Sequence, residues 1–159
     1  MSQKPEEPMR TYLVVIDETD ESGAALRFAA RRAAKTGGTV EILALVPPAE
    51  FVQWGGVQAT MEQEARQRAE ALVAGAAGAL VEEAGVQPKI TVRQGEPVAV
   101  VRDMLRENPG VAALVLGAAP SGSPGVLVSH FAGVDAGKLP CPLMIVPGSL
   151  DSEAIDRLS

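Results

Sequence analysis

Five short apolar runs, separated by segments with helical periodicity, constrain the fold of this sequence more than any other feature. Runs of this length, mostly rich in Val, Leu and Ile, are typical of strands buried on both faces of a sheet. Strands that alternate with helices pair in parallel, because each helix carries the chain back to the same edge of the sheet. The sequence therefore predicts an α/β fold: a doubly wound, five-stranded parallel sheet with helices on both faces. The predicted strands are residues 12–16, 40–46, 88–93, 111–116 and 143–146.

The segments between these runs carry the start and stop signals of helices. The first helix is expected to begin at Asp20 or Ser22, whose side chains are common N-caps, and to end before Gly37. A second, long helix is predicted from residue 59 to residue 84. A third has Pro97 at its first position, where the missing N–H of proline breaks no helical hydrogen bond. A fourth, poorly patterned helix precedes the last strand.

Composition excludes several classes of protein. Fourteen basic residues against twenty acidic ones give a net charge of −6, and the basic residues are scattered, so we expect no nucleic-acid partner. No run reaches the ~18 consecutive apolar residues of a membrane span, so we expect no membrane contact. The single cysteine, Cys141, cannot form an internal disulfide, and the N-terminus lacks the apolar run of a signal peptide. We therefore expect a cytoplasmic protein.

The length of 159 residues is that of one domain. The aromatic content is only 3%, so the core of this domain must be built mainly from aliphatic side chains. We predict one domain over residues 10–148, preceded by a disordered tail over residues 1–9 and followed by a polar C-terminal tail over residues 149–159.

Polar and small residues follow the predicted strands at the edge where open parallel sheets bind ligands, beyond the carboxyl ends of the strands. These segments contain neither a P-loop nor a dinucleotide fingerprint, since the first turn reads Asp17-Glu-Thr-Asp-Glu-Ser22. They also lack the Gly-x-Ser-x-Gly elbow of hydrolases, and one His and one Cys are too few for a zinc site. The sequence thus predicts no catalytic residue and no metal.

Five short motifs, in order and in register from Arg10 to Gly148, resemble the universal stress protein family. The resemblance implies the adenine nucleotide alpha hydrolase-like version of the fold, with strand order 3-2-1-4-5. It also implies a non-enzymatic, regulatory role in the stress response, and ATP or another adenine nucleotide as the cofactor of some members. The motifs are Val15-Ile-Asp17 with Ser22, Ala25-Leu26, Gly95-Glu-Pro97, Leu114-Val-Leu-Gly117 and Pro140-Cys-Pro-Leu-Met-Ile-Val146.

By this resemblance, the members of the family that bind ATP share a Gly-x2-Gly-x9-Gly-[Ser/Thr] motif after the fourth strand. The corresponding stretch of this sequence departs from that motif. Gly117 matches the first glycine, Pro120 replaces the second, and Ser129-His130 stands where Gly-Ser is expected. A proline removes an amide donor, and a side chain at Ser129 narrows the approach to the backbone. The sequence therefore predicts a degenerate nucleotide site that does not retain ATP.

Two alternatives stay open for the function: an ATP-binding switch with weak ATPase activity, and a protein-interaction module. Alternatives also stay open for single residues. Asp17 either contacts a nucleotide or caps the next helix, and His130 either meets a phosphate or is a polar surface residue. The loop Ser121-Gly-Ser-Pro-Gly125 offers glycines and hydroxyls for a different anion nest. The candidate nucleotide-site residues are Asp17, Leu45, Gly117, Ser121, Gly122, Gly125, Ser129 and His130.

Two segments are predicted to contact other chains. The last strand, Leu143-Met144-Ile145-Val146, carries no charge and falls at one edge of the sheet, so we expect a homodimer paired through it. The resemblance points to the same strand. The loop over residues 47–58 holds Phe51, Val52 and Trp54, and large apolar side chains in a loop indicate a surface for a protein partner.

Overall fold

The computed structural model describes residues 10–47, 55–72, 74 and 88–159. Phe51, Val52 and Trp54, and most of the second half of the predicted long helix, lie outside the described residues. None of the helices within the described ranges is long and apolar enough to cross a membrane.

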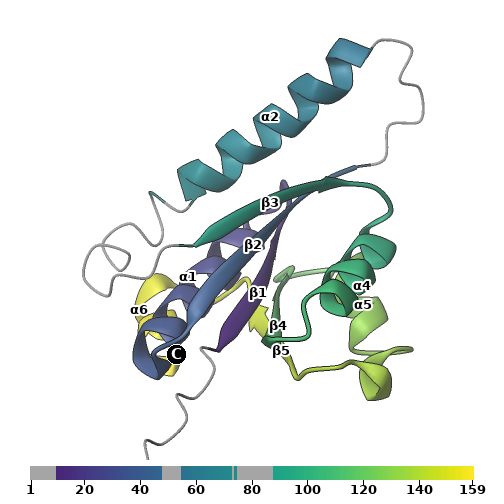
Figure 1. The fold of residues 1–159 in the computed structure, drawn as a ribbon. Helices are drawn as coiled ribbons and strands as arrows, with labels where there is room; N and C mark the ends of the chain where they lie inside the picture. The colour runs from purple at the N-terminus through teal and green to yellow at the C-terminus, as the bar shows by residue number, and fades with distance from the viewer. Residues whose placement is uncertain (1–9, 48–54, 73, 75–87) are drawn as a thin grey trace, which may run out of the picture.

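The five predicted strands form one parallel sheet in the order β3-β2-β1-β4-β5, which confirms the predicted fold class and strand order (Figure 1). The ends of the observed strands lie within two residues of the predicted ones: β3 is shifted by one residue toward the C-terminus, and β4 continues to Ala118. The strands are β1 (Thr11–Ile16), β2 (Thr39–Val46), β3 (Lys89–Gln94), β4 (Val111–Ala118) and β5 (Leu143–Pro147).

Helices cover both faces of the sheet, with α1, α2 and α6 on one side and α4 and α5 on the other (Figure 1). A short 3-10 helix, Ala136–Lys138, follows α5. The helices are α1 (Glu21–Thr36), α2 (Gly55–Leu72), α4 (Pro97–Glu107), α5 (Val126–Phe131) and α6 (Ser152–Leu158).

The central strand β1 divides the core into two clusters. Tyr12, Val14 and Ile16 pack on the α1 side, and Leu13 and Val15 pack on the α4 and α5 side. Side chains alternate in this way because the strand has a period of two residues. Leu13 and Val14 are fully buried, and burying such a side chain stabilises the fold by about 1.5–3 kcal/mol.

Local sequence signals set the end of α1 and the start of α4. Gly37 ends α1 in the left-handed region, with φ of 69°, and its N–H donates to the Ala33 carbonyl. Pro97 begins α4 as predicted, and the preceding Glu96 accepts hydrogen bonds from the N–H groups of Val98 and Ala99. These two bonds lower the pKa of Glu96, because they stabilise its charged form.

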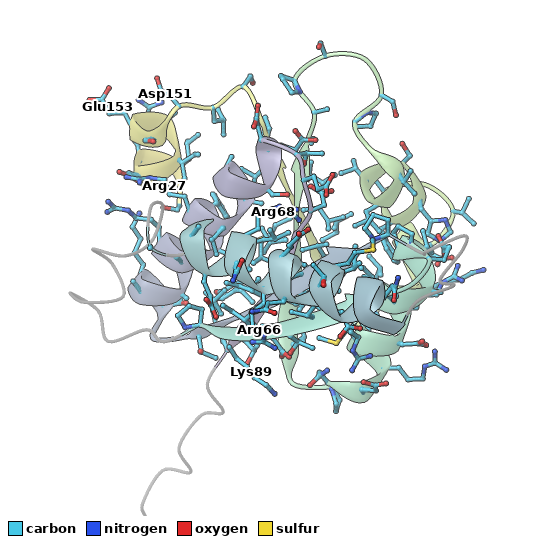
Figure 2. All side chains as sticks on the ribbon, turned by 90° about the horizontal axis from the view of Figure 1, so that it is seen from above. Arg27, Arg66, Arg68, Lys89, Asp151 and Glu153 are labelled. Atoms are coloured by element: carbon cyan, nitrogen blue, oxygen red, sulfur yellow. The ribbon has the colours of Figure 1, made fainter. Side chains whose placement is uncertain are left out.

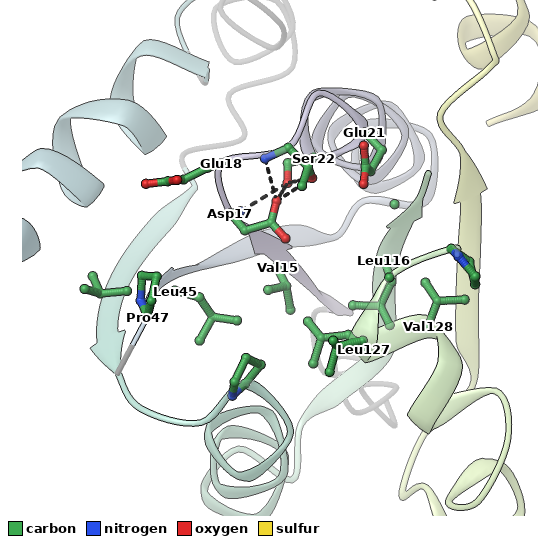
Figure 3. A pocket seen from close by; sticks show the side chains of 17 residues that line it. Val15, Asp17, Glu18, Glu21, Ser22, Leu45, Pro47, Leu116, Leu127 and Val128 are labelled. Atoms are coloured by element: carbon green, nitrogen blue, oxygen red, sulfur yellow. Dashed lines mark hydrogen bonds between the residues drawn. The ribbon is translucent and has the colours of Figure 1, made fainter. Parts of the chain in front are cut away.

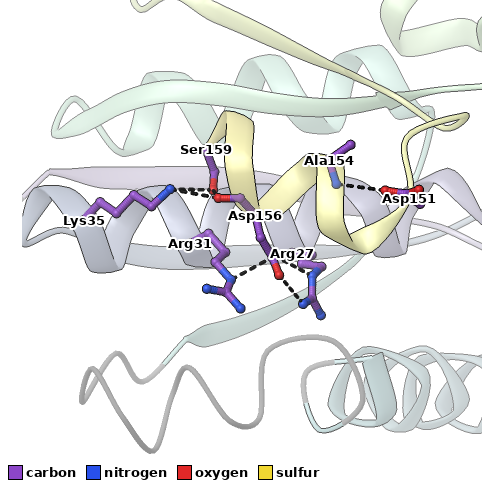
Figure 4. A network of polar contacts seen from close by, with 7 residues as sticks. All are labelled: Arg27, Arg31, Lys35, Asp151, Ala154, Asp156 and Ser159. Carbon is purple, nitrogen blue, oxygen red and sulfur yellow. Dashed lines mark hydrogen bonds and ion pairs between the residues drawn. The ribbon is translucent and has the colours of Figure 1, made fainter.

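The C-terminal residues differ from the predicted polar tail, because they form α6. Asp151 caps this helix by accepting a hydrogen bond from the N–H of Ala154, and Ile155 is buried against α1. Asp156 forms ion pairs with Arg27 and Arg31 of α1 at 2.8 and 2.9 Å (Figure 4). Seen from above, Arg27 lies beside α6 (Figure 2). One charged residue of this polar segment, Asp156, therefore attaches it to α1.

Candidate ligand site at the carboxyl edge of the sheet

A cavity of about 300 Å³ opens beyond the carboxyl ends of β1, β2 and β4 (Figure 3). This is the edge at which open parallel sheets bind ligands. Apolar side chains from three strands, α4 and α5 form most of its wall. The apolar lining residues are Val15, Leu45, Val46, Pro47, Pro97, Leu116, Pro124, Val126, Leu127 and Val128.

Asp17 lines this cavity and also stabilises the turn between β1 and α1. Its Oδ1 accepts hydrogen bonds from the N–H of Thr19 at 2.9 Å and from Ser22 Oγ at 2.7 Å, as well as from the Thr19 hydroxyl. The Asp17 N–H donates back to Ser22 Oγ at 3.1 Å. The other oxygen, Oδ2, takes part in no hydrogen bond within the described part of the chain. Figure 3 shows it directed toward the cavity.

Neither Asp20 nor Ser22 caps α1 with its side chain. Asp20 occupies the N-cap position of α1, but its backbone is helical and its side chain makes no capping hydrogen bond. Ser22 lies inside the helix, and its hydroxyl is used by Asp17. The predicted start of α1 at Asp20 is therefore confirmed, but the predicted side-chain cap is wrong for both residues, because the backbone of Asp20 is helical and the Ser22 hydroxyl is bound to Asp17.

Gly117 lines the cavity at the end of β4, where the sheet touches the start of α1. A Cβ atom at this position would lie 2.3 Å from the backbone carbonyl oxygen of Glu21. Since real Cβ atoms do not approach a backbone so closely, only glycine fits here. This close packing accounts for the glycine without any phosphate.

Backbone hydrogen bonds hold the loop from Ala118 to Gly125, one within the loop and one to the residue after β5. The N–H of Ala119 donates to the Pro124 carbonyl at 3.1 Å, and the Ala118 carbonyl accepts from Gly148 at 2.8 Å. Pro120 and Pro124 have no N–H to offer. Two residues of the predicted anion nest, Pro124 and Gly125, line the cavity. Ser121 and Gly122 are exposed and do not line it.

Ser129 and His130 are not brought to the cavity either. His130 Nε2 lies 2.8 Å from Asp135 Oδ2 and 2.9 Å from Arg102 Nη2, on the α4 side of α5. The hydrogen bond from His130, together with that from Arg102, holds the pKa of Asp135 below its ordinary value. His130 is therefore part of a surface charge network. Ser129 is exposed on the same helix.

Among the residues that the structure describes, the charged groups that line the cavity are all acidic. They are Asp17, Glu18 and Glu21, and the lining residues include no Lys, Arg or His. Arg68 of α2 forms an ion pair with Glu18 at 3.2 Å, whereas Asp17 and Glu21 form none with any residue that the structure describes. Within the described ranges, no group of three or more metal-binding side chains is present.

The sequence predicted four of the cavity residues: Asp17, Leu45, Gly117 and Gly125. It missed Val15, although a strand places residues two apart on the same face, so that Val15 accompanies Asp17. It also missed Glu21, whose carboxylate reaches the rim because α1 begins so close to Gly117. Leu127 and Val128 had no usable signal, since their helix is only six residues long.

Open, doubly wound α/β sheets bind their ligands at the carboxyl edge of the sheet, which is where this cavity lies. The model of the universal stress protein family matches residues 9–147. The chain therefore belongs to the universal stress protein family, and the predicted resemblance is confirmed. No curated protein matches it.

Solved structures of universal stress proteins share this fold. One from Burkholderia pseudomallei has a TM-score of 0.63 and 16% identity, and the match covers 90% of this chain and 99% of that one. One from Archaeoglobus fulgidus has a TM-score of 0.62 and 21% identity, with 86% and 93% covered. A second from Archaeoglobus fulgidus, with a TM-score of 0.54, 19% identity, and 87% and 98% covered, was solved in complex with dAMP.

Proposed function

We propose that this protein is a non-enzymatic regulator of the cytoplasmic stress response whose cavity binds an adenine-type compound weakly and does not retain ATP. Membership of the universal stress protein family supports the stress-response role. The complex of a protein of the same fold with dAMP supports the choice of an adenine-type ligand. We assign Asp17, Leu45, Gly117 and Gly125 to the binding cavity.

The observation that carries this proposal is the chemistry of the loop after β4. A phosphate chain needs several backbone N–H groups that converge on it, or cations, or both. Here Pro120 and Pro124 have no N–H, and the Ala119 N–H is used within the loop. With two donors missing and a third occupied, the loop offers the phosphates of ATP fewer N–H groups than a glycine-rich loop does.

The test is to purify the protein without added nucleotide, denature it, and quantify the released nucleotide by chromatography. We expect far less than one equivalent of ATP. A universal stress protein with an intact glycine motif, treated in parallel, is the control for loss during purification. Near-stoichiometric ATP would refute the proposal and favour the ATP-binding switch, for which a slow release of phosphate would be the second sign.

The stress-response role has its own test. Cells that lack the gene are compared under several stresses with cells complemented by the wild-type gene or by the Asp17→Ala variant. We expect the wild-type gene to restore survival. If the deletion changes survival under none of the stresses, the role in the stress response is wrong, whatever the cavity binds.

We also propose that the protein is a homodimer paired through β5. Leu143, Met144, Ile145 and Val146 lie on a strand at the edge of the sheet, and Ile145 is 41% exposed. Pairing of two copies about a two-fold axis satisfies the free backbone groups of such a strand and closes without forming a fibre.

A further inference from the structure

We infer that the cavity selects a ligand without phosphate: an uncharged compound with a flat aromatic ring and hydrogen-bond donors, of the nucleoside class. This inference rests on the proposed function in one respect, that the cavity is a ligand site. It goes further by assigning the discrimination against phosphate to the carboxylates of the site, above all Glu21.

The apolar wall fits a ring. Val15, Leu45 and Leu116 close the floor of the cavity with exposed fractions of 4%, 6% and 2%, and each belongs to a different strand. Leu127 and Val128 of α5 face this floor from the side (Figure 3). A volume of about 300 Å³ stands at the lower end of the range for small-molecule sites. The space suits a ring system with a small polar substituent.

The polar groups of the cavity are acceptors. Ionised Asp and Glu side chains can only accept hydrogen bonds. Asp17 Oδ1 already receives bonds from Thr19 and Ser22, so the Oδ2 atom that faces the cavity is the acceptor left for a ligand. Glu21 supplies a further carboxylate on the same side. A ligand in contact with these atoms must present hydroxyl or amino hydrogens.

The charge of the cavity opposes phosphate. Of the residues that the structure describes, three carboxylates line the cavity, and the cation paired with one of them is Arg68 of α2, bound to Glu18. Arg102 of α4 does not line the cavity and forms an ion pair with Asp135 at 2.6 Å. A phosphate in the cavity would therefore meet unpaired negative charge at Asp17 and Glu21 without a described cation to offset it. Each added phosphate charge should weaken binding further.

The experiment is isothermal titration calorimetry of the full chain with adenosine, AMP and ATP as probes, without magnesium, at low and at high salt. We expect adenosine to bind at least about tenfold more tightly than AMP at low salt, and ATP to bind more weakly still. Salt screens the repulsion, so the ratio between adenosine and AMP should fall as the ionic strength rises.

The variant Glu21→Gln removes one charge and keeps the shape of the side chain. It should bring the affinities of AMP and adenosine several-fold closer together, while circular dichroism shows the fold unchanged. Glu153→Gln, on α6 and outside the cavity lining, is the matched control and should leave the ratio as it is.

Three results would overturn the inference. They are AMP or ATP binding as tightly as adenosine to the wild-type protein, magnesium-ATP binding more tightly than adenosine, and no binding of any probe. The last result would remove the ligand class but not the stress-response role, because the complementation experiment tests that role separately.

Discussion

Asp17 acts on the turn and on the cavity through different oxygen atoms. Oδ1 accepts the hydrogen bonds of Thr19 and Ser22, whereas Oδ2 faces the cavity. We predict that Asp17→Ala lowers the free energy of unfolding by about 1–3 kcal/mol, since the hydrogen bonds to a charged acceptor are lost, and weakens binding of adenosine. Urea denaturation and calorimetry measure the two effects.

The control for this variant is Asp20→Ala. Asp20 is exposed and its side chain makes no capping hydrogen bond, so the stability should change by no more than about 0.5 kcal/mol. Unchanged stability in Asp17→Ala would show that the turn does not depend on the carboxylate. Unchanged adenosine affinity would remove Asp17 from the binding site.

Gly117 tests whether close packing or ligand binding requires the glycine. We predict that Gly117→Ala destabilises the protein by about 1–3 kcal/mol even without ligand, because the new Cβ atom would meet the Glu21 backbone at 2.3 Å. Gly110→Ala is the matched control, since no atom lies within 4 Å of a Cβ built there. Thermal or urea unfolding compares the two variants. Equal stability of both would mean that β4 and α1 separate easily at this contact.

At the scale of elements, the attachment of α6 to α1 should depend on pH. The hydrogen bond from Arg27 lowers the pKa of Asp156, so its contribution to stability is complete above the pKa of the unfolded chain, near 4. That contribution is lost as the pH falls through the lower pKa of the folded protein. We expect Asp156→Asn to cost about 1 kcal/mol or less at pH 7, because the pair is partly exposed.

Unfolding curves of wild type and Asp156→Asn, recorded from pH 7 to pH 2.5, measure this effect. The difference between the two proteins should be constant down to pH 5 and shrink below pH 4. Glu153→Gln, on the same helix, should follow the wild type at every pH. A difference that grows as the pH falls would contradict the role assigned to the ion pair.

The sequence predicted those helices and strands whose own residue pattern is enough to identify them. The buried strands show as runs of Val, Leu and Ile, and Pro97 marks the start of α4. The short helix α6 could not be predicted, because its stability comes from Ile155 and Asp156 in contact with α1, not from its own periodicity. Local order there is a result of tertiary packing.

The same limit applies to the cavity. Residues directly after a strand, such as Asp17 and Gly117, could be placed because parallel strands end at a common edge. Ser129 and His130 could not, since a loop of unknown path comes before α5 and decides which face of that helix meets the sheet. The acidic residues of the first turn were visible in the sequence, but their meaning depends on whether a cation lines the cavity beside them, and the structure places none there among the residues it describes.

At the scale of the whole molecule, the two edges of the sheet differ in charge. The edge strand β3 carries Lys89 and Arg93, and such charges discourage pairing with another strand. The opposite edge strand β5, Leu143–Pro147, carries no charge, and Ile145 is 41% exposed on it. An uncharged edge with an exposed isoleucine is the one suited to pair with a second copy.

We predict that the protein sediments as a dimer of twice 16.5 kDa and that Ile145→Lys shifts it to the monomer. A lysine at this position would place two like charges close together across the two-fold axis and would remove apolar area from the interface. Val134→Lys is the control, since Val134 is 75% exposed in the turn after α5 and is not part of β5, so its replacement should leave the dimer intact. Analytical ultracentrifugation from micromolar concentration upward gives the masses. A monomeric wild-type protein at micromolar concentration would refute pairing through β5, and dissociation of both variants would show that added positive charge, not the edge strand, decides the oligomeric state.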